Sequence, residues 1–246
     1  MDLRDRVVLL TGGKRVGASV AIELARKGAH VSMSYNRSRA DVEATASAIR
    51  AAGGQAMVWQ ANLANAADCE ALVAATVAEL GRLDVLVNMA SVYRSIPFDE
   101  MTGDHLNASL DVDLASAFLC ARAAAPHMRA AGGGRIVNFS DWLAVSARPR
   151  YKGYLSYYVA KKAVIGLTEA LALELADDQI LVNAIAPGPI LAPPDLSDAE
   201  FEAVEKATPL GRWGGGVEIA KAVIALIETD FITGEVIRVD GGRHIR

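Results

Sequence analysis

Short apolar runs rich in β-branched residues alternate along this 246-residue chain with alanine-rich stretches whose apolar residues recur at helical spacing. The runs are continuously apolar rather than alternating, which is typical of strands buried on both faces of a parallel sheet. Strands are predicted at Val7–Thr11, His30–Tyr35, Gln55–Gln60, Leu83–Asn88, Arg135–Ser140, Ile180–Ala186 and Glu235–Val239. Predicted helices include Ala18–Lys27, Ala40–Ala51, Ala66–Leu80 and Val159–Leu175. The alternation predicts a doubly wound α/β fold, with a parallel sheet of about seven strands and helices on both faces.

One long connection interrupts this alternation, and the sequence has no stretch typical of a linker, so residues 1–246 are expected to form a single domain. The connection covers residues 187–216 and contains Pro187, Pro189, Pro193, Pro194 and Pro209. Long connections in compact domains are usually functional, and this one leaves the carboxyl end of a predicted strand, where α/β folds bind ligands. We therefore expect residues 187–216 to form a substrate lid.

The charge pattern narrows the class of partner. The formal net charge is -4 with both signs mixed, so neither a basic stripe for nucleic acid nor a polybasic segment for a membrane surface is present. A small-molecule substrate is expected. The apolar runs are too short to span a bilayer, and the charged N-terminus leads directly into a strand, which predicts a cytoplasmic protein. Cys69 and Cys120 are expected to be buried free thiols, and the scattered histidines predict no catalytic metal.

A glycine-rich turn, with the sequence TGGKRVGA over residues 11–18, follows the first predicted strand and opens a helix. Backbone N–H groups in such a turn, together with the positive end of the helix, favour a bound phosphate. The position of the turn therefore predicts a dinucleotide site in a Rossmann-type domain, although a purely structural turn is the alternative. The candidate cofactor-binding residues of the turn are Thr11, Gly12, Lys14, Arg15, Val16 and Gly17.

The end of the second predicted strand indicates which dinucleotide is bound. A cofactor with a free ribose 2′-hydroxyl needs an Asp or Glu there, but the sequence continues with Arg37 and Ser38. These two side chains could hold a 2′-phosphate, with Lys14 or Arg15 approaching from the first turn. NADP(H) is therefore preferred over NAD(H), and the alternative is that Arg37 is only a solvated loop charge.

The segment that opens the helix after residue 155 carries the candidate reactive groups. Residues four apart lie on one helix face, so Tyr157 can meet Lys161. A neighbouring ammonium is expected to lower the pKa of a phenol, which would make Tyr157 useful in acid–base chemistry. Tyr158 and Lys162 have the same spacing, so the pattern by itself leaves two registers and also an ordinary amphipathic helix open.

Several motifs follow one another in a familiar order: the glycine-rich turn, Asn88–Ser91, the Tyr157/Lys161 pair, Pro187–Gly188 and Asp240–Gly242. In this order the chain resembles short-chain dehydrogenases/reductases over nearly its whole length. The segment AVIGLT at residues 163–168 aligns with the family's helix and selects Tyr157 and Lys161 over the neighbouring pair.

This resemblance implies an oxidoreductase that transfers hydride between NADP(H) and a C=N or C=O bond, with Tyr157 as the proton donor. It also implies that Lys161 tunes Tyr157 and contacts the nicotinamide ribose, and that the protein forms a homotetramer. The further cofactor-binding residues that it implies are Asn62, Leu63, Asn88, Ala90, Ser91, Tyr157, Lys161, Pro187, Gly188 and Ile190.

Some motifs depart from the family's usual pattern. The glycine turn looks one residue shorter than TGxxxGxG, and Asp141 stands where most relatives place a serine; pteridine reductases resemble this chain in both respects. Ser140 is no easy substitute, because successive strand side chains point to opposite faces. Asp141 is expected to assist proton transfer, with a helix-cap or loop role as the alternative. Asp113 replaces a common Asn, and the interval from Asp141 to Tyr157 is longer than in pteridine reductases, so the proton relay and the pocket shape stay open.

Pteridine-like substrates are the leading expectation. Tyr93, Trp142 and Tyr151 are flat side chains that could stack on a heteroaromatic ring or simply pack against the pocket wall or core. The basic C-terminal tail resembles those of dihydromonapterin reductases, and in related tetramers such tails lie near a neighbour's active site; a solvated tail is the alternative. A general ketone or 3-oxoacyl reductase is the enzymatic alternative, and it would be expected to prefer Ser at position 141. A non-catalytic NADP-binding regulator is the other alternative.

Overall fold

The computed structural model describes residues 1–194 and 196–245, so Asp195 of the expected lid and Arg246 of the basic tail lie outside it. Within those residues, seven parallel strands form one sheet in the order β3-β2-β1-β4-β5-β6-β7. The strands are β1 (Val7–Thr11), β2 (His30–Tyr35), β3 (Ala56–Gln60), β4 (Val85–Asn88), β5 (Gly134–Phe139), β6 (Ile180–Pro187) and β7 (Val236–Val239). The predicted parallel sheet is confirmed, and each strand ends within two residues of its predicted bounds.

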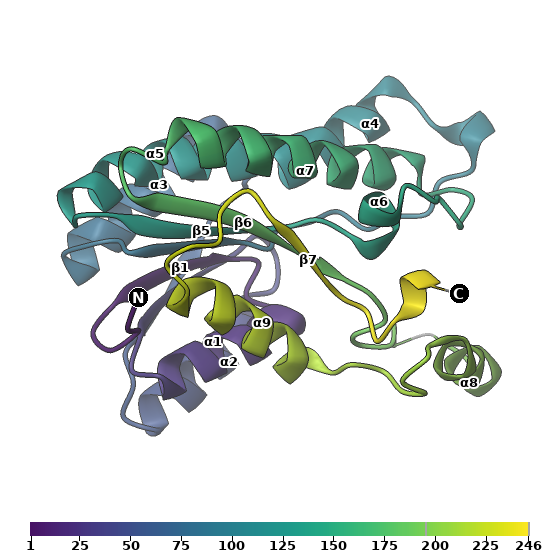
Figure 1. Cartoon of the computed structure of the whole chain (residues 1–246), viewed down its shortest axis with the longest axis horizontal. Coiled ribbons are helices and arrows are strands. Elements are labelled where there is room, and N and C mark those ends of the chain that lie inside the picture. The colour runs from purple at the N-terminus through teal and green to yellow at the C-terminus, as the bar shows by residue number, and fades with distance from the viewer. Residues whose placement is uncertain (195, 246) are drawn as a thin grey trace.

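Helices cover both faces of the sheet (Figure 1). One layer consists of α1 (Val16–Arg26), α2 (Arg39–Ala51) and α9 (Gly216–Glu228), and the other of α3 (Ala66–Leu80), α5 (Ser116–Ala130) and α7 (Leu155–Glu174). Successive strand side chains pack into different layers: Val8 and Leu10 join the first core cluster, whereas Val7 and Leu9 join the second. This two-sided burial explains why the strands are continuously apolar in sequence.

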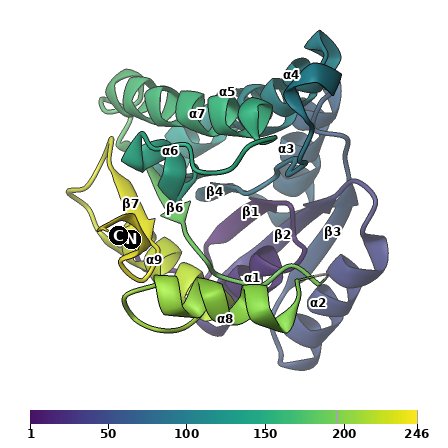
Figure 2. The same ribbon diagram turned by 90° about the vertical axis from the view of Figure 1, so that its right-hand side faces the viewer.

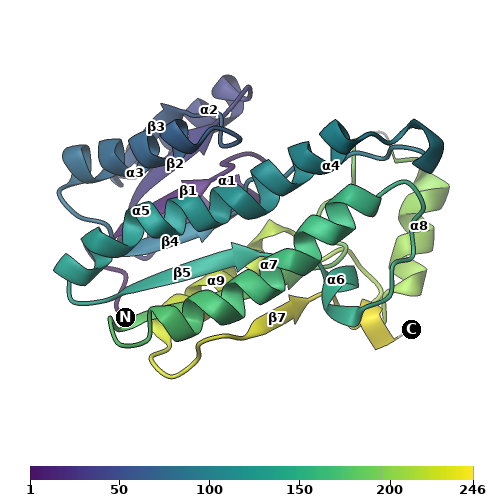
Figure 3. The same ribbon diagram turned by 90° about the horizontal axis from the view of Figure 1, so that it is seen from above.

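Shorter elements gather near the carboxyl ends of the strands, which face the viewer in Figure 2 and lie to the right in Figure 3. They are η1 (Phe98–Glu100), α4 (Gly103–Ser109), the π-helical turn η2 (Leu110–Ala115), α6 (Trp142–Ser146), α8 (Asp198–Ala207) and η3 (Arg243–Ile245). The connection at residues 187–216 is therefore not wholly irregular, because α8 forms within it. Ser197 and Glu200 cap this helix reciprocally, each accepting a hydrogen bond from the other's backbone N–H.

The strand order places a crevice beside β1. From β1 the chain winds outward through β2 and β3, then returns to place β4 on the other side of β1. The connections on either side of the β1–β4 pair run in opposite directions, and ligands of open α/β sheets bind at such a switch point. Thr11 and Asn88, the last residues of these two strands, are register partners at this edge. The fold thus brings the glycine-rich turn and the end of β4 together.

Two glycine positions test how tightly this turn is packed. A Cβ added to Gly17 would lie 2.3 Å from the Gly12 carbonyl oxygen, whereas one added to Gly166 in α7 would meet nothing within 4 Å. We expect Gly17→Ala to lower the free energy of unfolding by about 1–3 kcal/mol, because the turn must shift. Gly166→Ala should raise it by roughly 0.4–1 kcal/mol by restricting the unfolded chain. Urea unfolding followed by circular dichroism measures both, and equal changes in the two variants would contradict the crowding.

Candidate active site

Tyr157 and Asp141 meet at the carboxyl end of β5. Tyr157 lies in the first turn of α7, and its hydroxyl donates to Asp141 Oδ2 at 3.0 Å. The other carboxyl oxygen of Asp141 accepts from the backbone N–H of Leu143 at 2.8 Å and so caps α6. The two alternatives for Asp141 are therefore not exclusive: the cap fixes the carboxyl group, and the free oxygen faces the phenol.

Lys161 lies one turn further along α7 and is buried, whereas Tyr157 is half-buried. Its Nζ donates to the carbonyl oxygen of Phe139 at 2.9 Å and forms an ion pair with Asp113 Oδ1 at 2.9 Å. The same Nζ lies 5.7 Å from the centroid of the Tyr157 ring. A half-buried phenol and carboxyl group, of Tyr157 and Asp141, therefore lie beside the buried ion pair of Lys161 and Asp113.

The neighbouring pair on α7 is placed differently. Lys162 Nζ donates to the carbonyl oxygen of Ala144, within α6, at 3.1 Å. Ser140, the other hydroxyl near this point, donates to the backbone carbonyl of Lys161 at 2.8 Å and so serves the packing of β5 against α7. The tertiary structure thus brings Tyr157 to Asp141 and Lys161 to Asp113, and it directs Lys162 and Ser140 to backbone carbonyls.

Burial dominates the acid–base properties of this site. Desolvation raises the pKa of Tyr157 well above its usual value, and the nearby carboxylates of Asp141 and Asp113 raise it further. The net shift is therefore opposite to the lowering expected from a neighbouring ammonium, because desolvation and two carboxylates set its direction. Desolvation also raises the pKa of Asp141, although the Leu143 N–H, the Tyr157 hydroxyl and the Lys161 charge oppose the shift.

A row of tyrosine rings leads to the Tyr157 hydroxyl. Tyr93, which is 59% exposed, stacks on Tyr154 with ring centroids 4.6 Å apart and meets Tyr157 edge-on at 4.9 Å. Tyr151 meets Tyr154 edge-on at 6.5 Å. Tyr93 and Tyr151 were predicted as substrate residues from the sequence, but Tyr154 was not. Its position immediately before α7, one turn before Tyr157, could have indicated it.

Trp142 is placed differently from the exposed tyrosines. Its side chain is buried, with the residue only 6% exposed, and the guanidinium carbons of Arg150 and Arg243 lie 5.1 Å and 6.0 Å from its ring. Arg243 belongs to η3, so the described part of the C-terminal tail packs on α6 of its own chain. These contacts agree with Trp142 packing in the core rather than stacking on a substrate ring.

The first turn has the geometry that a pyrophosphate requires. Gly12 has φ +77°, and a Cβ there would lie 3.1 Å from the backbone nitrogen of Ala90. Thr11 Oγ1 accepts from the N–H groups of Met89 and Ala90 at 3.0 and 3.2 Å, which ties the turn to the segment after β4. No side chain caps α1, which begins at Val16, so the positive end of this helix is open to an anion. These residues fit a dinucleotide phosphate.

Basic side chains surround this turn in distinct environments. Arg37 is exposed after β2, beside Ser38, which precedes α2 without capping it. Lys14 forms an exposed ion pair with Asp41 at 3.1 Å. Arg15, with φ +56°, donates to the carbonyl oxygens of residues 191 and 192 at 3.1 and 2.8 Å, so it fastens the expected lid to the turn.

The remaining residues implied for cofactor binding flank the same edge. Asn88 Nδ2 donates to Asn138 Oδ1 at 2.9 Å, while Asn88 Oδ1 is buried and has no partner among the described residues. The hydroxyl of Ser91 donates to Asp113. Pro187 ends β6, and Gly188 follows it so close to Asp240 that a Cβ would lie 2.5 Å from the Asp240 Cβ. Asn62 lies exposed after β3, and Leu63 and Ile190 are buried.

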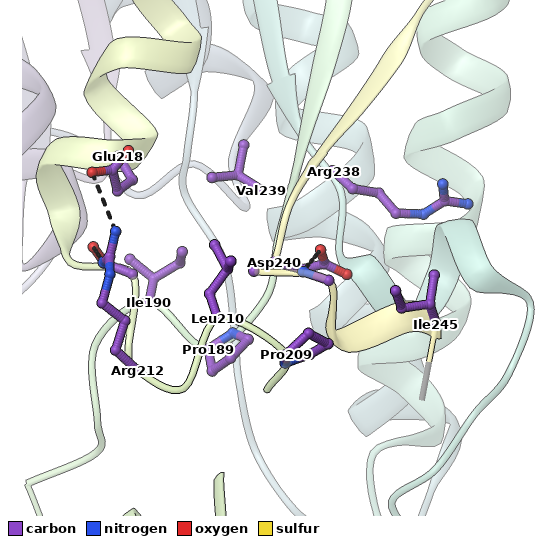
Figure 4. Close-up of a pocket in the computed structure, with 13 residues that line it drawn as sticks. Pro189, Ile190, Pro209, Leu210, Arg212, Glu218, Arg238, Val239, Asp240 and Ile245 are labelled. Carbon is purple, nitrogen blue, oxygen red and sulfur yellow. Dashed lines mark hydrogen bonds and ion pairs between the residues drawn. The ribbon is translucent and has the colours of Figure 1, made fainter. Parts of the chain in front are cut away.

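A cavity of about 450 Å³ opens elsewhere on the same side of the sheet (Figure 4). It lies between residues 189–190 and 209–218 on one side and the end of β7 with the segment after it on the other, and an Arg212–Glu218 ion pair of 3.7 Å lies at one end. None of the Tyr157 cluster lines it, so its position does not locate the chemistry. In residues 1–194 and 196–245, no group of three His, Cys, Asp or Glu side chains is placed to hold a metal. No helix in these residues is long and apolar enough to cross a membrane.

Comparison with known proteins extends over almost the whole chain. The family model described as enoyl-(acyl carrier protein) reductase matches residues 13–244. The chain is 38% identical to the short-chain reductase protein NovJ of Streptomyces niveus, over 98% of this chain and 94% of the relative. It is 36% identical to the 3-oxoacyl-[acyl-carrier-protein] reductase FabG of Staphylococcus aureus, over 96% and 97% of the two chains.

Solved structures support the same relationship. A short-chain dehydrogenase from Burkholderia cenocepacia, crystallised in complex with NADP, superposes with a TM-score of 0.90 at 31% identity, over 99% of both chains. The resemblance inferred from the motifs is thus confirmed at the level of the family, whereas none of these relatives is named as a pteridine reductase. The chain belongs to the short-chain dehydrogenases/reductases, in the family that the enoyl-(acyl carrier protein) reductase model describes.

Proposed function

We propose that this protein is an NADP(H)-dependent oxidoreductase that transfers hydride between the nicotinamide and a C=O or C=N bond. The observation that carries the proposal is the cluster of the half-buried Tyr157 and Asp141 with the buried Lys161, in which the Tyr157 hydroxyl lies 3.0 Å from a carboxyl oxygen. The cluster stands at the carboxyl edge of the sheet, as does the glycine-rich turn that fits a dinucleotide phosphate. A relative with an NADP complex supports the choice of cofactor.

Each group has a distinct role in this proposal. Bound NADPH would supply the hydride. Tyr157, whose raised pKa keeps the phenol protonated, donates its proton to the substrate oxygen or nitrogen. Asp141 lies within hydrogen-bond distance to return a proton to Tyr157. An ammonium has three donors, and Lys161 uses two on Phe139 and Asp113, so one is left for the nicotinamide ribose.

The substrate class that we place first is a carbonyl compound such as a ketone or a 3-oxoacyl thioester. The names of the relatives support it, because NovJ is called a short-chain reductase and FabG a 3-oxoacyl-[acyl-carrier-protein] reductase. Residues 187–216, fastened by Arg15, would act as the substrate lid.

A pteridine-like ring is the second candidate, and a specific observation favours it. The carboxyl of Asp141 and the tyrosine row through Tyr93, Tyr154 and Tyr151 offer a proton donor beside flat surfaces suited to a heteroaromatic ring. The third possibility, a regulator that binds NADP without turnover, is disfavoured because the complete acid–base cluster is present.

A panel of substrates tests the function directly. We expect NADPH oxidation with ketones or 3-oxoacyl thioesters, and with dihydropterins if the second candidate is correct. Tyr157→Phe should reduce turnover by about 10²–10⁴-fold, because the proton donor is lost, and should leave NADPH affinity measured by fluorescence titration intact. Tyr158→Phe on the same helix is the matched control and should keep its turnover. NADPH binding without turnover of any compound would favour the regulator.

Cofactor preference tests the assignment of Arg37. NADPH should bind more tightly than NADH in calorimetric titration, because only NADPH carries the 2′-phosphate. Arg37→Ala should weaken NADPH binding roughly tenfold or more and leave NADH binding unchanged, since a charge-assisted contact contributes about 1.5–3 kcal/mol. Arg26→Ala serves as the control, because Arg26 ends α1 and lies at the opposite end of that helix from the glycine-rich turn. Equal affinities of the unmodified protein for the two cofactors would overturn the preference.

The pH profile tests the proton relay. Because the pKa of Asp141 is raised by burial, the carboxyl loses its proton only above its ordinary range. The relay then has no proton to return, so the rate of reduction at saturating substrate should fall as the pH rises through the folded-state pKa of Asp141. Asp141→Asn keeps the hydrogen-bonding shape without ionising, so its profile should lack this decline. An unchanged profile in Asp141→Asn would exclude the relay.

A further inference from the structure

Asp113 is a buried carboxyl group for which the proposed reaction leaves no role. It lies in the π-helical turn η2, and its side chain is 0% exposed. Three donors converge on it: Lys161 Nζ at 2.9 Å, the backbone N–H of Val92 at 3.0 Å, and the hydroxyl of Ser91. Such an arrangement suits an ionised carboxylate, because every contact supplies a hydrogen to it.

The ion pair between Lys161 and Asp113 neutralises the positive charge of the site. Lys161 is buried, with its side chain 4% exposed, and a buried ammonium is costly unless a counter-ion accompanies it. Asp113 supplies the negative charge on the side of η2, and the Phe139 carbonyl supplies a second acceptor on the side of β5. The ammonium is therefore fixed between the sheet and the turn, with its charge already compensated.

This compensation changes what Tyr157 and Asp141 experience. The charged or titratable groups that face them are Lys161 from the same helix, Asp113 from η2 and Tyr93 from the segment after β4. Lys161 still lowers the pKa of Asp141, but its charge, shared with the adjacent Asp113, does not overcome burial. Burial then prevails and raises the pKa of both groups, and the charge of Asp113 adds to the shift at Tyr157.

We propose that Asp113 is the fixed counter-ion of Lys161, a positioning residue that holds the ammonium in place and leaves Asp141 as the carboxyl that gains and loses a proton beside Tyr157. Asp113 carries no proton in this scheme, because its oxygens are committed to donors that hold their hydrogens. The proposal rests on the proposed function for its catalytic meaning, but the charge arrangement itself is measurable without turnover.

Infrared spectroscopy tests this arrangement, because the C=O stretch of a protonated carboxylic acid disappears when the group ionises. The Asp141 band is identified as the one that Asp141→Asn removes. Asp113→Asn leaves the charge of Lys161 uncompensated, so the midpoint of that band should move to lower pH by about one unit or more. Asp111→Asn is the matched control, because Asp111 is exposed on the same turn, and it should leave the midpoint in place.

An Asp141 midpoint that Asp113→Asn does not move, or that Asp111→Asn moves equally, would overturn the proposal. Thermal unfolding of Lys161→Met and of the double variant Lys161→Met/Asp113→Asn gives a second test, which holds even where Asp113→Asn alone does not fold. Lys161→Met strands a buried carboxylate, so the double variant should melt at the higher temperature. A double variant that melts no higher contradicts the counter-ion role. Neither measurement uses substrate or cofactor, so a chain that reduces nothing in the substrate panel still gives an answer here.

Discussion

A parallel sheet that is covered by helices on both faces can present functional groups only at its edges and ends, and this constraint organises the molecule. All strands of the described sheet run the same way, so their carboxyl ends meet at one edge. The glycine-rich turn follows β1, Asn88 ends β4, and Asp141 follows β5 after a single residue. Residues that are remote in sequence meet there because the two helical layers leave that edge open.

At this edge, several titratable groups share a single positive charge. One ammonium, that of Lys161, faces two carboxyl groups and a phenol. Lys161 Nζ lies 2.9 Å from Asp113 Oδ1 but 5.7 Å from the centroid of the Tyr157 ring. These surroundings raise the pKa of the Tyr157 phenol, and in the proposed reaction Asp141, capped onto α6 and hydrogen-bonded to the phenol, is the group that exchanges a proton with it.

The relatives and the site point to different substrate classes for different reasons. Relatives of this kind are similar over almost the entire chain, and a likeness so broad reports the shared scaffold and cofactor edge. In the proposed site the substrate meets only a few side chains, among them Asp141 and the tyrosine row, and Asp141 is one of the residues in which this chain departs from the usual pattern. The family assignment therefore follows from the whole chain, whereas the choice of substrate depends on the few side chains of the site.

The sheet and the cofactor-binding edge were predictable from the sequence, because both depend on patterns within short segments. Continuous apolar runs require two-sided burial, and glycines after the first strand, at Gly12 and Gly17, require a tight turn, so the sheet and the cofactor edge follow from short segments. Helical spacing placed Tyr157 near Lys161 but allowed Tyr158 and Lys162 equally well. Only the tertiary structure decided which carboxyl meets which donor: Asp113 reaches Lys161 from a different element, and burial reverses the expected shift in the pKa of Tyr157. Desolvation and ion pairing depend on groups that are distant along the chain, and no local pattern reports them.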